Sequence, residues 1–340
     1  MVPASAPRQG WGDGCLNLSG RRVRAVFIGG CPRSGTTLLG SMLGAHPDCL
    51  CVPESRFKIT ALRARDSAQG NMDLAHILDV IGKDWRFQLW EVDISATRVS
   101  GALDGGSYAA LIEGIVNRYA ERIGKPGSRL WVDHTPSNVR HSATLFDLFP
   151  DARMIHLVRD GRAVAASVLP LDWGPNRINR AAQYWVEMVG HGLAAEACWG
   201  ASRVARVRYE DLVQDPEGTL QRLCVWLEID YDARMQEADG FSVPEYTRPH
   251  HQLVGKAPVP ERVSAWRRAL SPRQIEIFES EVGDCLRCLG YAPVHGIRAR
   301  PMSSWELTRQ WLADMLRRQL ANPARHGLRR RRARRGSPRS

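Results

Sequence analysis

The sequence predicts an α/β fold in which a doubly wound parallel sheet carries helices on both faces. Short apolar runs alternate along the chain with longer segments of helical periodicity, a pattern typical of βαβ units. A glycine-rich turn joins the first apolar run to a helix, and charged residues follow several later runs. Ligands of open α/β sheets bind at the carboxyl ends of the strands, so we expect these turns and charges to share one crevice.

The expected elements follow from periodicity and from the residues that begin or end them. Strands are expected where short apolar runs occur, at residues 24–29, 129–133, 153–158 and 203–208. Helices are expected where apolar residues recur at helical spacing, at residues 36–45, 73–82, 107–122, 138–148, 161–169, 177–198, 219–227 and 272–289. A further helix is expected from Pro53 to about Arg65, because Pro is favoured at the first helical position.

The chain divides into three parts. Residues 1–20 contain Pro, Gly and Ser without periodicity and predict a disordered arm. Residues 21–296 predict one α/β domain, in which residues 240–262 have the composition of a lid-type loop. Residues 297–340 form a separate appendage, where Ser303 and Glu306 fit the capping box of a basic amphipathic helix.

The net charge of the chain arises in this appendage. The whole chain carries +11, and residues 298–340 hold 13 Arg and two acidic residues, so the rest of the chain is neutral overall. A basic amphipathic helix followed by an Arg-rich tail can contact an anionic membrane, nucleic acid or an acidic protein. A nucleic-acid interpretation would therefore depend on the tail alone.

The composition of the sequence, and the lack of a recognisable targeting signal in it, predict a cytoplasmic, bacterial protein. No apolar run is long enough to span a bilayer, and residues 1–22 lack the apolar core of a signal peptide. Arg outnumbers Lys 43 to 4, which is typical of a GC-rich genome. The eight Cys are scattered, and the one C-x-x-C motif, Cys285 to Cys288, falls in a helical pattern without a second pair at zinc spacing.

The first strand continues into a phosphate-binding turn. Gly30 is followed after four residues by Gly35, Thr36 and Thr37, which is the spacing of a P-loop. Thr36 replaces the Lys that normally reaches the β- and γ-phosphates, and Arg33 supplies a cation inside the loop instead. Free N–H groups and hydroxyl groups at the start of the helix complete an anion site. The fold is therefore expected to be P-loop-like, with phosphate binding that differs from that of a triphosphate hydrolase.

A second phosphate site is expected after the strand at residues 153–158. Arg159 would lie at the carboxyl end of this strand, Asp160 is a candidate helix cap, and Gly161 permits the turn. Ser167 follows Arg159 by eight residues, about two helical turns.

Together the two motifs resemble the nucleotide site of sulfotransferases that use 3′-phosphoadenosine-5′-phosphosulfate (PAPS). This resemblance implies that Arg159 and Ser167 hold the 3′-phosphate of PAPS. It also implies that the 5′-phosphosulfate lies against the first loop, at Pro32, Arg33, Ser34, Gly35, Thr36 and Thr37.

The resemblance covers about residues 24–292 and is closest to the tyrosylprotein sulfotransferase type. Glu54 and Arg56 resemble the catalytic Glu of that type and a neighbouring Arg. Tyr209 resembles the Tyr at the end of a strand, and Lys256 resembles a Lys that closes over the nucleotide.

The chain also departs from this type. His134 stands where the family has a Lys that assists at the leaving-group side, while the cytosolic small-molecule enzymes have a catalytic His just after a strand. His134 is therefore a candidate for either a helper or the base. The animal enzymes pair the Cys that matches Cys51 with a second Cys, and Val132 at that position excludes the bridge here. Those enzymes also carry a membrane anchor.

The resemblance implies sulfuryl transfer to an acceptor hydroxyl without a metal. Glu54 would take the acceptor proton, Arg33 would stabilise charge on the departing oxygen, and His134 would assist the leaving group. Arg56 and Thr135 would face the acceptor, which is a peptide tyrosine, a carbohydrate or another small-molecule hydroxyl. The competing interpretations are a P-loop phosphotransferase and a nucleotide-regulated binding protein that acts through its basic tail.

Overall fold

A computed structural model describes residues 23–67, 74–94, 107–171, 173–241 and 260–316, together with Gln319. The expected arm, most of the expected lid-type loop with Lys256, and the Arg-rich run at the end of the chain lie outside the described residues. Within the described part, no helix is both long and apolar enough to cross a membrane.

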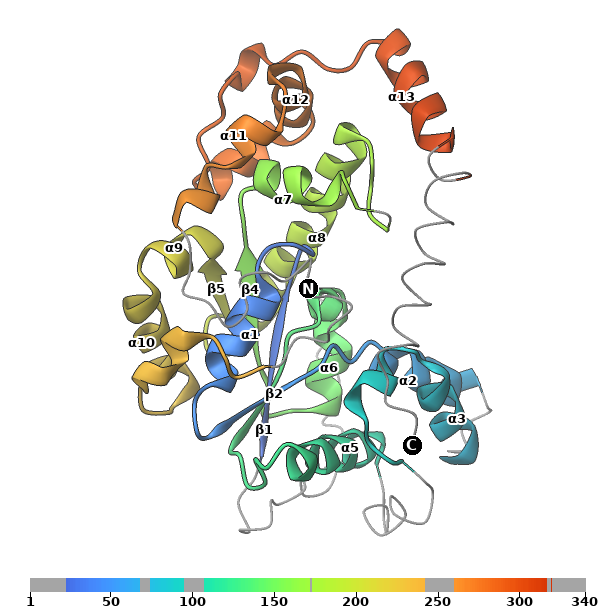
Figure 1. Cartoon of the computed structure of the whole chain (residues 1–340), viewed down its shortest axis with the longest axis vertical. Coiled ribbons are helices and arrows are strands. Elements are labelled where there is room, and N and C mark those ends of the chain that lie inside the picture. The colour runs from blue at the N-terminus through green and yellow to red at the C-terminus, as the bar shows by residue number, and fades with distance from the viewer. Residues whose placement is uncertain are drawn as a thin grey trace, which may run out of the picture.

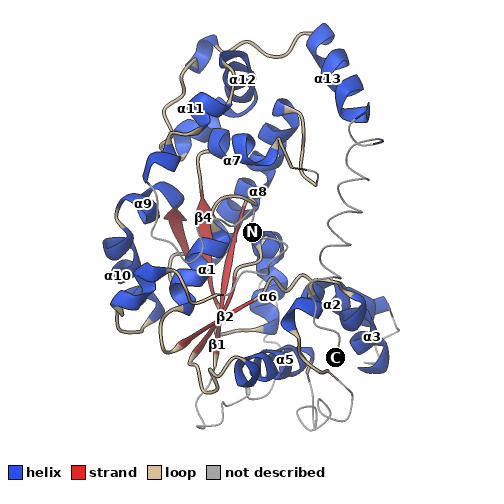
Figure 2. Cartoon of the chain, viewed as in Figure 1, coloured by secondary structure: helices blue, strands red, loops and turns tan. Residues whose placement is uncertain are grey.

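Five parallel strands form the centre of the molecule, in the order β2-β3-β1-β4-β5 (Figure 2). They are β1 (Arg24–Gly30), β2 (Cys49–Val52), β3 (Leu130–Asp133), β4 (Arg153–Val158) and β5 (Val204–Arg208). The chain builds the sheet on one side of β1 first, through β2 and β3, and then on the other side, through β4 and β5. The switch point of this doubly wound order therefore lies at the carboxyl end of β1, where such folds bind their ligands.

Alternating residues of the strands face two separate hydrophobic cores. Val26 and Ile28 of β1 lie in one core, and Phe27 lies in the other. The first core is covered by α1 (Thr36–Gly44), α9 (Tyr209–Gln214), α10 (Pro216–Leu227) and a 3₁₀ helix (Ala233–Glu237). Both faces of β1 to β4 are thus buried, as the continuous apolar runs of the sequence predict, whereas the edge strand β5 leaves Arg206 exposed.

The larger core lies on the other face of the sheet (Figure 1). It is built with residues of α2 (Phe57–Ser67), α3 (Leu74–Lys83), α5 (Tyr108–Arg122), α6 (Ser142–Leu148), α7 (Gly161–Val168), α8 (Ile178–Trp199) and α12 (Pro272–Cys288). Shorter helices complete the described fold: Phe87–Trp90, Pro136–His141, Pro260–Val263, α11 (Trp266–Ala269) and Gly296–Arg298. Trp185 of α8 donates from Nε1 to the carbonyl oxygen of Arg159 at 3.0 Å, so this core fixes the end of β4 directly.

The expected fold class is confirmed, and most elements lie within three residues of their expected bounds. Two expected helices differ in detail, and two elements were not expected. The helix expected from Pro53 begins at Phe57, because β2 ends at Val52 and residues 53–56 form a loop. The strand β2 and the short helix α9 were not expected at all. The helix expected at residues 138–148 is divided into a 3₁₀ turn and α6.

The capping box of the appendage is present at α13 (Ser304–Leu316). The Ser303 hydroxyl accepts a hydrogen bond from the backbone N–H of Glu306 at 3.3 Å, and the Glu306 carboxylate accepts one from the N–H of Ser303 at 2.8 Å. The backbone N–H groups of Ser303 and Glu306, two of the free donors at the helix start, are thereby satisfied.

Candidate active site

The loop after β1 is shaped by close backbone packing and ends in a helix N-terminus. A Cβ atom on Gly30 would lie 2.2 Å from the carbonyl oxygen of Leu157, so only glycine fits between β1 and β4. Gly35 has a left-handed backbone (φ 100°) directly before α1, and the ring of Tyr209 packs against it. The free N–H groups at the start of α1 give this loop the properties of an anion site.

The loop after β4 has the cap that the sequence predicts. Asp160 accepts a hydrogen bond at its side chain from the N–H of Arg162 at 2.9 Å and caps α7. The Arg162 guanidinium is buried, binds the Asp160 carboxylate, and donates to Glu279 of α12 at 2.7 Å. This buried pairing fixes the start of α7, and with it the direction in which Ser167 is presented.

The two predicted phosphate loops are in direct contact. Arg33 donates from Nε to the Ser167 hydroxyl at 3.1 Å, and Arg159 donates from Nη1 to the Arg33 carbonyl oxygen at 2.8 Å. The Arg159 guanidinium also lies 4.2 Å from the centre of the Tyr209 ring. Arg33, Arg159, Ser167 and Tyr209 thus form one cluster at the switch point of the sheet.

This cluster fits an anionic ligand. The Ser34 hydroxyl and Arg159 Nε are buried and have no hydrogen-bond partner among the described residues. Buried polar groups are normally paired, so two such donors at one site indicate a polar group that binds there. Burial, followed by the charge of Arg159, lowers the pKa of Arg33. An anion between the two guanidinium groups would relieve this repulsion.

Glu54 lies in the loop between β2 and α2, next to the exposed Arg56. Its side chain is 32% exposed, and a carboxylate oxygen lies 3.9 Å from Nε of Arg86. Desolvation raises the pKa of Glu54, and Arg86 is the largest opposing influence. A carboxylate with a raised pKa is a stronger base, which suits proton removal from a hydroxyl.

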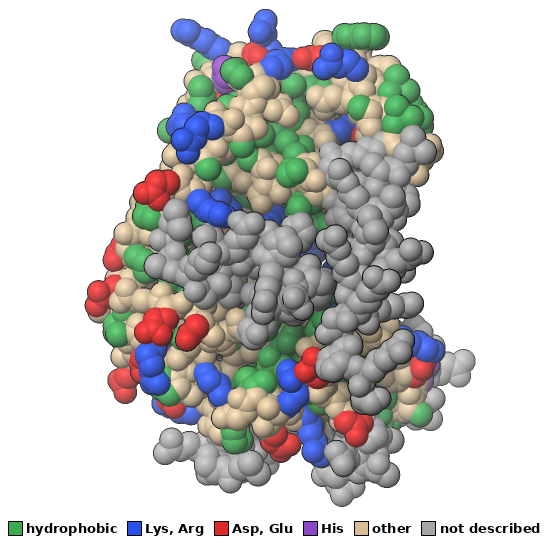
Figure 3. Space-filling view, viewed as in Figure 1, with side chains coloured by type: hydrophobic (Ala, Val, Ile, Leu, Met, Phe, Trp, Pro, Cys, Tyr) green, Lys and Arg blue, Asp and Glu red, His purple; other side chains and the backbone are tan. Residues whose placement is uncertain are grey.

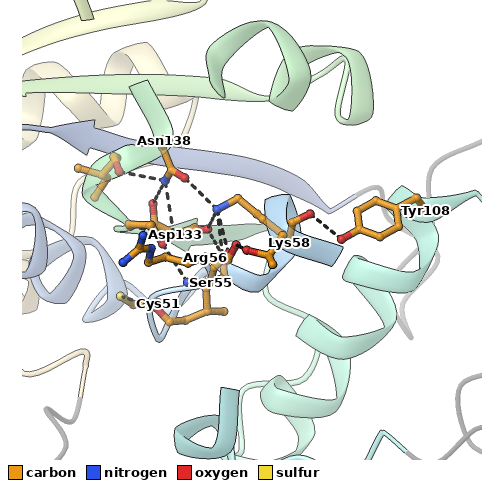
Figure 4. A network of polar contacts seen from close by, with 11 residues as sticks. Cys51, Ser55, Arg56, Lys58, Tyr108, Asp133 and Asn138 are labelled. Atoms are coloured by element: carbon orange, nitrogen blue, oxygen red, sulfur yellow. Dashed lines mark hydrogen bonds and ion pairs between the residues drawn. The ribbon is translucent and has the colours of Figure 1, made fainter. Parts of the chain in front are cut away.

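A buried ion pair supports the loop that carries Glu54 (Figure 4). The Lys58 ammonium lies 2.6 Å from Oδ2 of Asp133, and both side chains are almost completely buried. Lys58 also donates to Ser55 Oγ at 3.0 Å and to Asn138 Oδ1 at 2.8 Å. Burial alone would raise the pKa of Asp133, but Lys58 and hydrogen bonds from Ser55 and Thr135 lower it to about 2.

The network joins the ends of three strands. Thr135 donates from Oγ1 to Asp133 at 2.5 Å and accepts from the N–H of Ser55 at 2.9 Å, which ties the loop after β2 to the end of β3. Asn138 donates to the carbonyl oxygen of Ile28 at 3.0 Å and so includes β1. Thr135 is buried and its hydroxyl is used within the network, so the structure gives it the task of positioning Ser55. Asp133 neutralises the charge of Lys58 within this network.

His134 lies under α1, away from solvent. Its Nδ1 is 3.5 Å from Sγ of Cys51, its ring packs edge-on against Phe241 at 4.8 Å, and its Cβ lies against Gly40. Burial lowers the pKa of His134 to about 4, so the ring is neutral at pH 7. This placement favours a packing role over the two roles that the resemblance implies.

The structure also places the cysteine residues that the sequence analysis singled out. Cys51 is a free thiol, and its partner in the sheet register is Val132. Cys285 and Cys288 are free and lie on α12, as the helical pattern predicts. The described residues contain no cluster of three or more His, Cys, Asp or Glu suited to a metal ion.

Sequence reasoning missed two contributors to the site, Arg86 and Lys58. Arg86 lies just before a 3₁₀ helix, more than thirty residues from Glu54, and no motif marks it. For Lys58, the sequence does contain a pattern that could have indicated its role. A Lys one helical turn after an acidic loop, with an Asp at a buried strand end, is compatible with a buried pair.

Comparison with known proteins identifies the family of this fold. The family model described as "Sulfotransferase family" matches residues 25–233. Protein-tyrosine sulfotransferase of Drosophila melanogaster is 26% identical over 287 residues, 80% of this chain and 52% of that protein. Protein-tyrosine sulfotransferase 1 of Danio rerio is 28% identical over 286 residues, 79% of this chain and 72% of that protein. The chain spans about half the length of the Drosophila and Caenorhabditis elegans relatives.

The fold is shared with a solved bacterial domain. The sulfotransferase domain from the Synechococcus PCC 7002 olefin synthase superposes with a TM-score of 0.53 at 23% identity. The match covers 84% of this chain and 99% of that domain.

Replacing Lys58 tests the buried network. Lys58→Met leaves the buried Asp133 carboxylate without its counterion, and we expect the free energy of unfolding to fall by about 3–5 kcal/mol. Lys58→Met combined with Asp133→Asn removes both charges and should recover much of this loss. Urea unfolding of the two variants measures the difference. Equal stability of the single and double variants would contradict a coupled pair.

The burial of His134 predicts a pH dependence. Its pKa in the folded chain, about 4, lies below the ordinary value of 6.5, so the unfolded chain binds the proton first as pH falls. The free energy of unfolding should therefore decrease from pH 6.5 to 4 and be fully retained above that window. His141, whose pKa is also lowered to about 4 by burial, acts in the same direction.

His134→Gln should flatten this part of the stability curve, measured by thermal or urea unfolding at several pH values. His76→Gln, at an exposed position of α3, is the matched control for the substitution itself. An unaltered slope in His134→Gln would show that the ring is not held neutral.

Proposed function

This chain belongs to the sulfotransferase family, and on that premise we propose that it transfers a sulfuryl group from PAPS to an acceptor hydroxyl. The observation that supports the proposal most is the contact between the two phosphate loops. Arg33 reaches Ser167, Arg159 reaches the Arg33 backbone, and the buried Ser34 hydroxyl and Arg159 Nε are available for an anion. A nucleotide with phosphate groups at both its 5′ and 3′ positions matches two adjacent anion sites.

In the proposed arrangement each loop holds one end of the nucleotide. The start of α1, with Thr36 and Thr37, binds the 5′-phosphosulfate, and Arg159 and Ser167 bind the 3′-phosphate. Arg33 lies between them and stabilises negative charge on the departing oxygen. PAPS supplies the sulfuryl group. The same loops argue against a phosphotransferase, because Thr36 occupies the position of the Lys that reaches the β- and γ-phosphates.

Glu54 is the proposed base. Its raised pKa and partial exposure allow it to accept a proton from a hydroxyl in the crevice. The charge of Arg86 opposes this rise in the pKa of Glu54. The buried network holds the backbone at Ser55 and thereby fixes the direction in which Glu54 points.

The acceptor in this proposal is a phenolic hydroxyl of a peptide tyrosine. The curated relatives named above carry that activity in their names, and Arg56 and Arg86 beside Glu54 favour an acceptor with neighbouring acidic groups. Carbohydrate and other small-molecule hydroxyls are the alternatives that an acceptor panel would distinguish.

Binding of 3′-phosphoadenosine-5′-phosphate tests the nucleotide site. Calorimetry should show tight binding of this bisphosphate and much weaker binding of AMP and ATP. Arg159→Ala should weaken bisphosphate binding by at least tenfold, because a charged hydrogen bond is worth about 1.5–3 kcal/mol. Arg129→Ala, which removes a surface cation paired with Asp48, is the matched control. A preference for ATP, or equal binding by Arg159→Ala, would contradict the proposal.

Glu54→Gln tests the base. We expect turnover to fall by about 10²-fold or more while bisphosphate binding is retained, since general base catalysis contributes about that much. Product formation is measured with PAPS and a tyrosine peptide with acidic neighbours, and the same peptide with phenylalanine is the blank. Retained turnover in Glu54→Gln, together with its loss in His134→Ala, would move the base to His134.

A further inference from the structure

We propose that α13 binds the surface of an anionic membrane. This inference goes beyond the proposed function and depends on a different part of the molecule. A surface helix ordinarily turns its apolar side toward the protein, and α13 turns this side toward solvent. Its acidic residues face the protein, and its large apolar residues face solvent.

The inner side of α13 is held by ion pairs. Glu306 accepts bidentate hydrogen bonds from Arg273 of α12, at 2.9 Å to each carboxylate oxygen. Asp314 lies eight residues later on the same side of the helix and is 7% exposed, with its carboxylate 3.5 Å from Arg177. Both acidic residues of the appendage are therefore neutralised by the body of the protein. The remaining charged residue of α13, Arg309, is positive.

The outer side of α13 is apolar. Trp305, Leu312 and Leu316 recur at helical spacing on the side of the helix opposite to Asp314, and they are 72%, 45% and 53% exposed. Figure 3 shows hydrophobic side chains gathered at this end of the molecule. Trp311, which is also half exposed, lies away from this stripe and lines a pocket with Asp314 and Arg177. Exposed apolar side chains aligned on one helix face, with Arg309 between Trp305 and Leu312, indicate a binding site.

The charge around this stripe identifies the occupant. Arg309 is exposed on the same helix, and the sequence from Arg317 to Arg335 contains nine Arg and no acidic residue. An anionic bilayer surface offers both headgroup charge for the Arg residues and an acyl boundary for Trp and Leu. Nucleic acid would use the Arg residues but would leave the apolar stripe in water. A second copy of this chain would cover the stripe but would bring two Arg-rich segments together.

Vesicle binding by the whole chain tests the proposal. We expect cosedimentation with vesicles of phosphatidylcholine and phosphatidylglycerol, and little with phosphatidylcholine alone. High salt should weaken this binding, because exposed charges are screened. The triple variant Trp305→Ser, Leu312→Ser and Leu316→Ser should bind anionic vesicles at least tenfold more weakly. Val225→Ser removes another exposed apolar side chain, on α10, and should bind like the wild type.

Three outcomes would overturn the proposal. One is equal binding of the wild type and the triple variant to anionic vesicles, and another is the absence of any vesicle binding. The third is a dimer of the wild type, seen by light scattering without vesicle binding and abolished in the triple variant, which would make the stripe an interface between copies. Binding of 3′-phosphoadenosine-5′-phosphate by the triple variant reports that it is folded. That control also separates this proposal from the proposed function.

Discussion

The buried ion pair between Lys58 and Asp133 is the interaction on which the arrangement of the site depends. Removing two charges from water is costly, and the attraction between them offsets this only when the other hydrogen-bonding positions are filled. Ser55, Thr135 and Asn138 fill them here. Ser55 follows β2, Thr135 and Asn138 follow β3, and Asn138 also donates to Ile28 of β1, so the pair is satisfied only when the ends of β2 and β3 are in register with β1. The hydrogen bonds that the buried charges require therefore also fix the positions of the loops that form the site.

The phosphate loops obey a different constraint, which is close backbone packing. Gly30 is in contact with the β4 backbone, and Gly35 is in contact with the Tyr209 ring, so β1, β4 and β5 meet where the strand order reverses. Tyr209 and the Arg33 carbonyl oxygen then orient Arg159. One side of the switch point is therefore organised by a buried charge pair and the other by steric fit. Glu54 and the anion cluster lie on these two sides.

The sequence predicted those parts of the molecule that are encoded locally. Apolar runs, the glycine spacing of the first loop and the Asp160 cap depend on neighbouring residues, and the parallel sheet and both phosphate loops followed from them. Two kinds of feature were not predictable. The strand β2 has only four residues and precedes a proline, so a helix start at Pro53 competed with it. The contacts of Lys58 with Asp133, and of Arg33 with Ser167, join residues far apart in the chain and depend on tertiary packing.

The distribution of positive charge in the crevice follows from these contacts. The resemblance placed His134 where related enzymes carry a Lys, but burial keeps this ring neutral at pH 7. Lys58 brings an ammonium group to the same strand end from α2, yet Asp133 neutralises it within the network. Neither residue therefore supplies net charge to a leaving group. In the mechanism proposed above, that task falls to Arg33 and to the N-terminus of α1, which belong to the same loop.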